Sequence, residues 1–379
     1  MRTKLFKFAF IVGLAILVSS CAREETPTDS LKGALDGKFL IGTALNSIQI
    51  YGDDSAATEI IVRNFNSIVA ENCMKSEIIQ PEEGVFDFRQ SDAMVDFGVA
   101  YDMYIVGHCL IWHSQAPDWL FMDAGGKYVS REVLIERMKT HITTLVERYK
   151  GRVDAWIVVN EAFLDDGSWR NSRFYDIIGP AYIELAFQFA HEADPKAELL
   201  YNDNSMFHEG KRNSVVELVN DLKSKGIRID GVGMQAHSGL DSIPPLDEFE
   251  KSIEAFDAAG VDVHVTELDI TVIPLLSRDI GAEVSADFKY WEMMDPYPNG
   301  LPDSVSIALH DRYMEFFDLF LRQHDKIKRV TVWGLTDDQS WRNYWPIQGR
   351  TDYPLLYDRN YDAKPVVADI IKAAQSLEE

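Results

Sequence analysis

Two glutamates stand at the ends of apolar segments of the sequence, where a carboxylate is costly to bury. Glu161 lies in the segment WIVVNEA that begins at Trp156, and Glu267 ends the β-branched run VDVHVTE that begins at Val261. Charged side chains are seldom enclosed in a protein unless they are paired with another group. Two carboxyl groups held in one cleft can supply the acid and the carboxylate that cleavage of a glycosidic bond requires. A role of this kind depends on a fold that brings Glu161 and Glu267 together.

Eight short apolar segments, spaced roughly 30 to 60 residues apart, are the elements available to position them. They begin at Phe39, Phe65, Asp102, Val153, Glu198, Ile229, Val261 and Ile327. Helical spacing follows in stretches such as those from Arg131 and Ser214, and the second stretch ends at Gly226, a typical helix stop. Strands without alternation, each followed by a helix, favour a parallel sheet covered on both faces. Eight such units predict an α/β fold, a (β/α)8 TIM barrel in a single catalytic domain.

An open, doubly wound sheet is less well supported, because no GxGxxG or GxxxxGK[ST] motif follows any of these segments. In a TIM barrel the carboxyl ends of the strands form the working face. Alternation along a strand predicts that Glu267 shares a face with Val263 and Val265, and that Glu161 shares a face with Ile157 and Val159. Polar or indole side chains mark the carboxyl ends of the predicted strands, namely His108, Glu161, Asp203, Gln235, His237, Glu267 and Trp333.

Several segments around these residues combine amide, aromatic and charged side chains. They are AENCMKSE from Ala70, GHCLIWHSQAPDW from Gly107, WIVVNEA from Trp156, YND from Tyr201, GVGMQAH from Gly231, TELD from Thr266 and WGLTDDQSW from Trp333. In this collinear order the chain resembles glycoside hydrolase family 10, whose members are endo-β-1,4-xylanases built on a (β/α)8 barrel. The resemblance runs from about residue 39 to the C-terminus, which makes it far more specific than any single motif.

The resemblance implies a retaining endo-1,4-β-xylanase that hydrolyses internal linkages of xylan or xylo-oligosaccharides through a covalent glycosyl-enzyme, with no cofactor and no metal. It also implies that Glu161 is the acid/base and Glu267 the nucleophile. An ionised Glu267 nearby would favour the protonated form of Glu161. A retaining mechanism further predicts that the two carboxyl groups lie about 5 to 5.5 Å apart.

Other residues of the same motifs are predicted to support the pair. Asn160 precedes the acid/base and can hydrogen-bond the 2-hydroxyl of the sugar. His237 can donate to Glu267 and be oriented in turn by Asp269, which would keep the nucleophile ionised. The resemblance implies sugar binding by a wider set of side chains whose chemistry suits hydroxyl groups and pyranose faces. This set is Glu71, Asn72, Lys75, His108, Trp112, Gln115, Asn160, Gln235, His237, Trp333 and Trp341.

The sequence departs from the family pattern in three places, and some aromatic residues receive no role. Ser76 stands where proline is frequent, and Asn204-Ser205 stands where Tyr-Asn is usual, which puts the leaving-group side of the cleft in doubt. The segment 273–309 is longer than expected, and its Trp291 and Tyr297 either contact distal sugars or hold the loop in place. Residues given no functional role are Trp119, Trp156, Trp169, His113, His141 and His264.

The first 20 residues have the form of a secretory signal peptide. Basic residues precede an eleven-residue apolar run, Phe8–Val18, which is too short to span a bilayer. The next residues end in Cys21 and resemble the lipobox of bacterial lipoproteins; an ordinary signal peptide with an incidental cysteine is the alternative. We predict a signal peptide at 1–20, a lipidated Cys21 with a tether at 21–33, and the catalytic domain at 34–379. The lipid would be the only membrane contact of an outer-membrane or cell-surface lipoprotein of a Gram-negative bacterium, with a periplasm-facing location as the alternative.

Charge and cysteine content exclude several other functions. Loss of the signal removes three of the 37 basic residues and none of the 61 acidic residues, which leaves a net charge of −27. That field opposes binding to nucleic acid or anionic lipid, whereas a neutral glycan does not feel it. Besides Cys21 there are only Cys73 and Cys109, so a disulfide framework is excluded. We predict both as small buried residues, with a single bridge between them as the alternative.

Two other functions stay open on the sequence alone. A metal-dependent barrel enzyme, such as a sugar isomerase, would use the histidine and carboxylate side chains as ligands, although no HxH or HExxH pair is present. A non-catalytic glycan-capture lipoprotein would need the aromatic and amide residues but not the carboxylate pair. The sequence does not predict the preferred xylan decoration, the length of the cleft or the oligomeric state.

Overall fold

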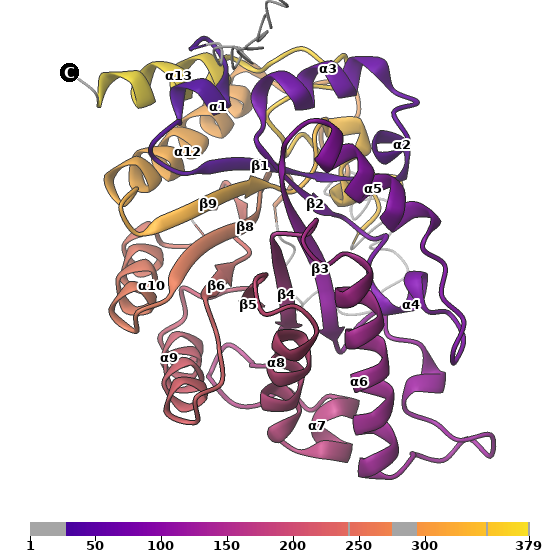
Figure 1. Ribbon diagram of the computed structural model, residues 1–379. Coiled ribbons are helices and arrows are strands. Elements are labelled where there is room, and N and C mark those ends of the chain that lie inside the picture. The colour runs from indigo at the N-terminus through magenta and orange to yellow at the C-terminus, as the bar shows by residue number, and fades with distance from the viewer. Residues whose placement is uncertain (1–27, 242, 275–293, 346–347, 378–379) are drawn as a thin grey trace, which may run out of the picture.

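The computed structural model of the chain describes residues 28–241, 243–274, 294–345 and 348–377. In these ranges the strands run through the middle of the molecule and the helices lie around them (Figure 1). The strands are β1 (Leu40–Leu45), β2 (Ser67–Ala70), β3 (Tyr104–Trp112), β4 (Ala155–Asn160), β5 (Glu198–Asp203), β6 (Gly231–Met234), β7 (His237–Gly239), β8 (Asp262–Thr271) and β9 (Ile327–Val332). Each predicted apolar segment holds one of them, and the sixth segment also begins the short β7.

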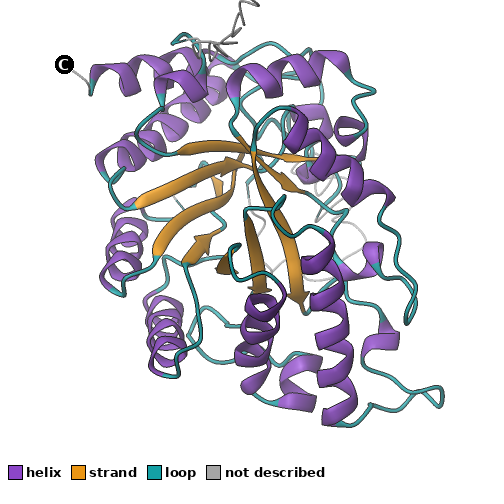
Figure 2. Ribbon diagram, in the orientation of Figure 1, coloured by secondary structure: helices purple, strands orange, loops and turns teal. Residues whose placement is uncertain are grey.

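The strands form a closed parallel sheet. Neighbours pair in the order β6-β5-β4-β3-β2-β1-β9-β8-β7, and a further pairing of β6 with β8 closes the ring. Every one of these pairings is parallel. The strands form the inner layer and the helices the outer layer (Figure 2). The predicted (β/α)8 TIM barrel is confirmed, with β7 lengthening the wall beside β8.

The helices of the outer layer follow the predicted spacing. They are α1 (Leu31–Ala34), α2 (Ser47–Ile50), α3 (Ser55–Asn64), α4 (Ser76–Ile79), α5 (Arg89–Ala100), α6 (Arg131–Arg148), α7 (Arg173–Ile178), α8 (Ala181–Ala193), α9 (Glu209–Ser224), α10 (Leu246–Ala258), α12 (Asp303–Arg322) and α13 (Pro365–Ser376), with 3-10 turns η1 (Asp118–Leu120), η3 (Asp337–Gln339) and η4 (Trp341–Asn343). Ser130 caps α6, which buries Leu134, Met138 and Ile142 at four-residue intervals. Gly226, at φ +70°, follows α9 as expected.

Side chains from both faces of the sheet are buried. Those that fill the barrel form their own cluster, which consists of Ala44, Val69, Val106, Cys109, Ala155, Ile157, Leu200 and Trp333. Behind the sheet, the Trp156 ring fills the space over Gly107, where a Cβ atom would lie 2.2 Å from the indole. Cys73 and Cys109 are buried and free, so the prediction of small buried residues is confirmed and the alternative of a bridge is wrong.

Strict alternation fails in both strands that lead to the glutamates. Val159, Val263 and Val265 belong to the cluster between the sheet and the helices, whereas Glu267 lines a cleft at the barrel mouth. The pairing register shifts after Ile157 in β4 and after Val265 in β8. Such irregularities turn the following side chains to the other face. The predicted shared face is therefore wrong for Val159, Val263 and Val265, whereas Ile157 belongs to the cluster inside the barrel. Both glutamates still reach the mouth.

The two ends of the described chain lie together. Gln375 donates a hydrogen bond to the Thr28 carbonyl at 2.8 Å, and α1, which begins inside the segment predicted as a tether, packs beside α13 (Figure 1). No helix among the described residues has the length and apolarity needed to cross a bilayer. The predicted signal peptide and Cys21 lie outside the described residues.

Tyr297 is the described member of the aromatic pair in the long segment 273–309. It packs against the hydrophobic core, and its carbonyl accepts the Tyr353 hydroxyl at 2.9 Å. Of the two roles predicted for Tyr297, holding the loop is the one that these contacts favour. Trp291 lies outside the described residues.

Candidate active site

A cleft of about 790 Å³ opens at the carboxyl ends of the strands. All eleven predicted sugar-binding residues and both predicted catalytic glutamates line it. They come from β3, β4, β7 and β8, from the turns after β2, β3, β4, β6 and β9, and from η4, so distant parts of the sequence meet around one space. Asp269, the predicted partner of His237, is fully buried behind the cleft wall. The structure therefore brings the predicted residues together.

Glu267 lies in β8 with only 5% of its surface exposed. His237 Nε2 lies 3.2 Å from its Oε2, and Asn202 Nδ2 donates to its Oε1 at 2.8 Å. Burial by itself would raise the pKa of this carboxyl group. The hydrogen bond and charge of His237, together with the Asn202 amide, outweigh burial and lower the pKa of Glu267 below its ordinary value. Glu267 is therefore ionised at neutral pH.

Asp269 holds His237 from the side away from the cleft. Asp269 Oδ1 lies 3.0 Å from His237 Nδ1 and accepts from Arg342 Nη2 at 2.9 Å, while its Oδ2 accepts from Trp341 Nε1 at 2.7 Å. Burial opposes the charged form of His237, but the charges and hydrogen bonds of Asp269 and Glu267 raise the pKa of His237 to about 9. His237 is therefore a cation at neutral pH that donates to both carboxylates, as the sequence predicts.

Glu161 occupies the first position after β4 and is half-buried. Its φ of +58° lies in the left-handed region, and its N–H donates to the Asn202 carbonyl at 2.8 Å. Gln235 Nε2 donates to Glu161 Oε1 at 2.9 Å, and the Gln235 carbonyl accepts the Glu267 N–H at 2.9 Å. One residue thus contacts both predicted catalytic residues.

The β2 and β3 side of the cleft is built from amide, ammonium and indole groups. Lys75 Nζ donates to Asn72 Oδ1 at 2.9 Å and to Gln115 Oε1 at 2.8 Å, and it lies 5.0 Å from the centre of the Trp112 ring. The orientation of the Asn160 amide that satisfies both of its ends has the oxygen accepting from Trp112 Nε1 at 3.2 Å. Hydrogen-bond donors and acceptors therefore alternate along a flat aromatic face, which suits a hydroxyl-rich ligand.

Deep burial shifts the pKa values of two titratable groups on this side of the cleft. His108 is 2% exposed and meets the Trp333 ring edge-on at 5.4 Å between centres. Burial lowers the pKa of His108 to about 4, so the ring is neutral at neutral pH. Burial also raises the pKa of Glu71, against the opposing charge of Lys75. A neutral ligand can enter such a cleft without meeting a strong field of one sign.

Comparisons with known proteins agree with this geometry. The family model described as Glycosyl hydrolase family 10 matches residues 30–373. An endo-1,4-beta-xylanase A of Xylanibacter ruminicola is 52% identical over 96% of this chain and 98% of its own length. A solved GH10 endoxylanase from a sugarcane soil metagenome has a TM-score of 0.85 and 44% identity, over 91% of this chain and 100% of that one. A mutant solved in complex with xylotriose has a TM-score of 0.80 and 32% identity, over 90% and 99%.

The chain belongs to glycosyl hydrolase family 10.

Some residues in and behind this family 10 cleft were not predicted from the sequence. Asn202 donates to Glu267, and its position near the end of a predicted strand, in the YND motif, could have indicated a role in the site. Arg342 contacts the buried Asp269, and Trp345 stacks on Trp341 with 5.1 Å between ring centres and 23° between planes. No pattern in the sequence marks these two. His113, which was given no role, also lines the cleft.

The substituted segment after the YND motif lies in the cleft of this family 10 protein. Asn204 and Ser205 line it together with Phe207 and the 46% exposed side chain of Ile243. Amide, hydroxyl and apolar side chains therefore meet in this part of the wall. The predicted change in leaving-group binding stays a prediction.

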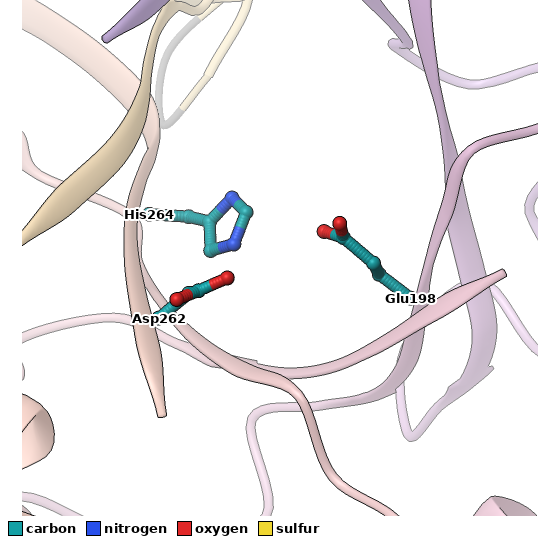
Figure 3. Close-up of side chains that lie close together, drawn as sticks. All are labelled: Glu198, Asp262 and His264. Atoms are coloured by element: carbon teal, nitrogen blue, oxygen red, sulfur yellow. The ribbon is translucent and has the colours of Figure 1, made fainter. Parts of the chain in front are cut away.

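A metal-dependent enzyme, one of the alternatives, would need a cluster of side chains that can bind a metal ion. Among the described residues one group of three meets, and it lies at the amino ends of β5 and β8, away from the cleft: Glu198, Asp262 and His264, with ligand atoms within 4.8 Å of one another. Figure 3 shows the ring and the two carboxylates turned toward one space. Lys328 Nζ bonds to Glu198 and lies 3.2 Å from Asp262 Oδ2. One ammonium group thus already pairs with both carboxylates.

Proposed function

We propose that this protein is a retaining endo-1,4-β-xylanase in which Glu161 is the acid/base and Glu267 the nucleophile. The observation that carries the proposal is the pairing of two unlike carboxyl groups in one cleft. Glu267 is enclosed and held ionised by a histidinium, whereas Glu161 is half-buried at the cleft wall. Gln235 contacts both, which ties their positions to each other.

Each group then has a defined step in the reaction. The Glu267 carboxylate attacks the anomeric carbon while the bond to the departing sugar breaks, and Glu161 gives its proton to the departing oxygen. A water molecule next attacks the glycosyl ester, Glu161 takes the proton of that water, and Glu267 leaves as a carboxylate. Two inversions restore the original configuration. This course needs a separation of about 5 to 5.5 Å between the carboxyl groups.

Support for xylan as the substrate comes from the relatives and from the cleft. The Xylanibacter ruminicola relative is named an endo-1,4-beta-xylanase, and one solved relative holds xylotriose. In this chain, indole rings and neutral amide groups line the same cleft as the glutamates. Flat apolar faces and paired donors and acceptors recognise pyranose rings and their hydroxyl groups.

The proposed roles are tested by reducing-sugar release from xylan. We expect Glu267→Ala to lower kcat by about four orders of magnitude or more, because it removes the nucleophile from a preorganised site. Glu192→Ala, an exposed glutamate on α8, is the matched control and should keep wild-type activity. Proton NMR of the first product should show the β anomer. Retained hydrolysis in Glu267→Ala, or an α anomer in the wild type, would contradict the proposal.

We further propose that residues 1–20 are removed on export and that Cys21 is lipidated and anchors the protein in the outer membrane, with residues 21–33 as a tether to the domain at 34–379. The sequence Val18-Ser19-Ser20-Cys21 supports this proposal. One acyl chain gives only marginal membrane binding, so a stable anchor needs more than one. Labelling cells with an alkyne fatty acid should mark the wild type, whereas Cys21→Ser should lose the label and leave the membrane fraction. Equal labelling of both would contradict lipidation.

A further inference from the structure

The turn that carries Glu161 has an unusual backbone. Glu161 is not a glycine, yet its φ of +58° lies where a side chain crowds its own backbone. A residue stays in this conformation only when its surroundings define it closely. The residues that define it stand on β5, the next strand of the barrel, where the Asn202 carbonyl accepts the Glu161 N–H at 2.8 Å.

Two buried side chains of β5 hold the backbone immediately after Glu161. The Tyr201 hydroxyl oxygen accepts the Ala162 N–H at 3.0 Å, and Asp203 Oδ2 accepts the Phe163 N–H at 3.3 Å. The same hydroxyl donates to Asp203 Oδ2 at 2.5 Å. Tyr201 and Asp203 are both fully buried. The two peptides that follow the proposed acid/base are therefore fixed by side-chain groups rather than by a strand ladder.

Lys211, on α9, contacts both the end of β5 and the loop that follows Glu161. Its side chain is fully buried, and Nζ lies 3.2 Å from Asp203 Oδ1 and 2.9 Å from Asp165 Oδ1. It also donates to the carbonyl and the side-chain oxygen of Asn204, each at 3.0 Å. Asp165 belongs to the loop that leaves Glu161, so one ammonium group connects that loop to the end of β5. Burial raises the pKa of Asp203 to about 6, against the charge of Lys211.

We propose that Tyr201, Asp203 and Lys211 are positioning residues that set the direction of the Glu161 carboxyl group toward the leaving oxygen, an inference that rests on the acid/base role proposed for Glu161. None of the three lines the cleft, so each acts through the loop backbone. A buried ion pair is a weak source of stability, because desolvation offsets its attraction. The placement of residues 162–165 is the more specific consequence of these contacts.

This role predicts a dependence on the leaving group. A well-placed general acid accelerates a reaction by about 10²- to 10⁴-fold, and only where the departing oxygen needs a proton. Phenyl β-xylobioside has a poor leaving group that needs protonation, whereas 2,4-dinitrophenyl β-xylobioside releases an anion that is stable without it. The ratio kcat/KM reports the steps up to bond cleavage, so it isolates the acid role of Glu161 from its later role as a base.

The experiment measures kcat/KM of both substrates for Tyr201→Phe and Asp203→Asn in the full-length protein. We expect a fall of about tenfold or more for the phenyl substrate and of less than about threefold for the dinitrophenyl substrate. Both changes keep the size of the side chain. An equal effect on the two substrates, or no effect on either, overturns the positioning role.

Two adjacent cations of α9, Lys211 and Arg212, provide a test variant and its control. Lys211→Met removes the contact with the Glu161 loop, whereas Arg212→Met removes a buried guanidinium that pairs with Glu248 at 3.1 Å on α10. Both lose a buried cation that pairs with a carboxylate, but only Lys211→Met should show the dependence on leaving group. The same dependence in Arg212→Met assigns the effect to general loosening and overturns the inference. If Lys211→Met does not fold, Tyr201→Phe decides the outcome.

Glu161→Ala is measured beside them to separate the two proposals. It should show the largest dependence on leaving group of all variants, because it removes the acid itself. If it shows that dependence and the β5 variants do not, the positioning role fails while the proposed function stands. If Glu161→Ala affects both substrates equally, the acid/base assignment fails and the positioning role fails with it.

Discussion

The two glutamates of the cleft are held in opposite ways. Glu267 is 5% exposed, and its side chain is bonded by His237 and Asn202, with Asp269 behind the histidine. Glu161 is half-buried, and the donor to its carboxylate is Gln235. The proposed nucleophile is thus fixed through its side chain, whereas the proposed acid/base is fixed mainly through the backbone around it.

This difference follows from what each group has to do. A nucleophile needs a constant charge and direction, which a preorganised network of donors provides. An acid/base has to change its protonation state in each turnover and exchange protons with water. Strong donors on the Glu161 carboxylate would fix its charge and oppose that exchange. The contrast can be tested by weakening the network around the nucleophile step by step.

The largest effect is expected for Asp269→Asn. The substitution keeps the shape but leaves Arg342, whose side chain is only 7% exposed, without its buried counter-charge, and leaves His237 with Glu267 alone. Loss of one partner of a buried pair destabilises a protein by about 3 to 5 kcal/mol. We expect a fall of that size in the free energy of unfolding, measured by urea denaturation at neutral pH, together with a loss of xylan hydrolysis.

Asp194→Asn is the control for this prediction. Asp194 is 2% exposed and accepts the backbone N–H groups of Gly151 and Lys196, and no cationic side chain in the described part of the chain pairs with it. We expect it to lower the free energy of unfolding by about 1 kcal/mol, the usual value of a hydrogen bond. If Asp269→Asn loses no more stability than Asp194→Asn, the buried charges around the nucleophile are not coupled as the contacts indicate.

The next effect is a dependence of stability on pH. The folded-state pKa of His237 is raised to about 9, whereas an unfolded histidine titrates near 6.5. The stabilisation is therefore complete below about pH 6.5 and is lost as the pH rises through about 9. A difference of this size corresponds to about 3 kcal/mol. Urea denaturation between pH 6 and 9.5 should show this loss in the wild type and not in His237→Gln.

His310 offers a comparison at the surface. It also lies next to two carboxylates, Asp311 and Asp369, and its pKa is raised by them, but solvent screens these pairs. His310→Gln should leave the pH dependence of stability close to that of the wild type. A pH profile that changes equally in His310→Gln and His237→Gln would place the titration outside the active site.

The sequence predicts the convergence of the site residues because barrel geometry is regular. Eight apolar segments that end in polar groups are enough to place Glu161, His237 and Glu267 at one end of a TIM barrel. The motifs around them also predict the His237–Asp269 contact, which lies between residues 32 positions apart. The sequence is thus enough to predict which residues near the strand ends gather at the mouth of the barrel.

The direction of side chains within the strands is harder to predict from the sequence. The register shifts after Ile157 and Val265 depend on how neighbouring strands pair, and no local pattern signals them. Arg342 contacts Asp269 from a turn 73 residues away, so its role exists only in the folded chain. The positive φ of Glu161 likewise arises from its contacts with β5 and not from its residue type.

The smallest effect is expected at the exposed end of the network around Glu267. Trp341 donates to Asp269 on one side and stacks on Trp345 on the other, and Trp345 lines the cleft with 58% of its surface exposed. We expect Trp345→Ala to remove a platform for one sugar ring and to raise KM for xylohexaose about twofold to tenfold, the equivalent of about 0.5 to 1.5 kcal/mol. The kcat should stay unchanged, because Asp269 keeps its hydrogen bond from Trp341. Tyr128→Ala, an equally exposed aromatic outside the cleft, is the control. A fall in kcat for Trp345→Ala would show that the stacked indole rings also orient the network around Glu267. Trp345 would then contribute to the chemical step and not to sugar binding alone.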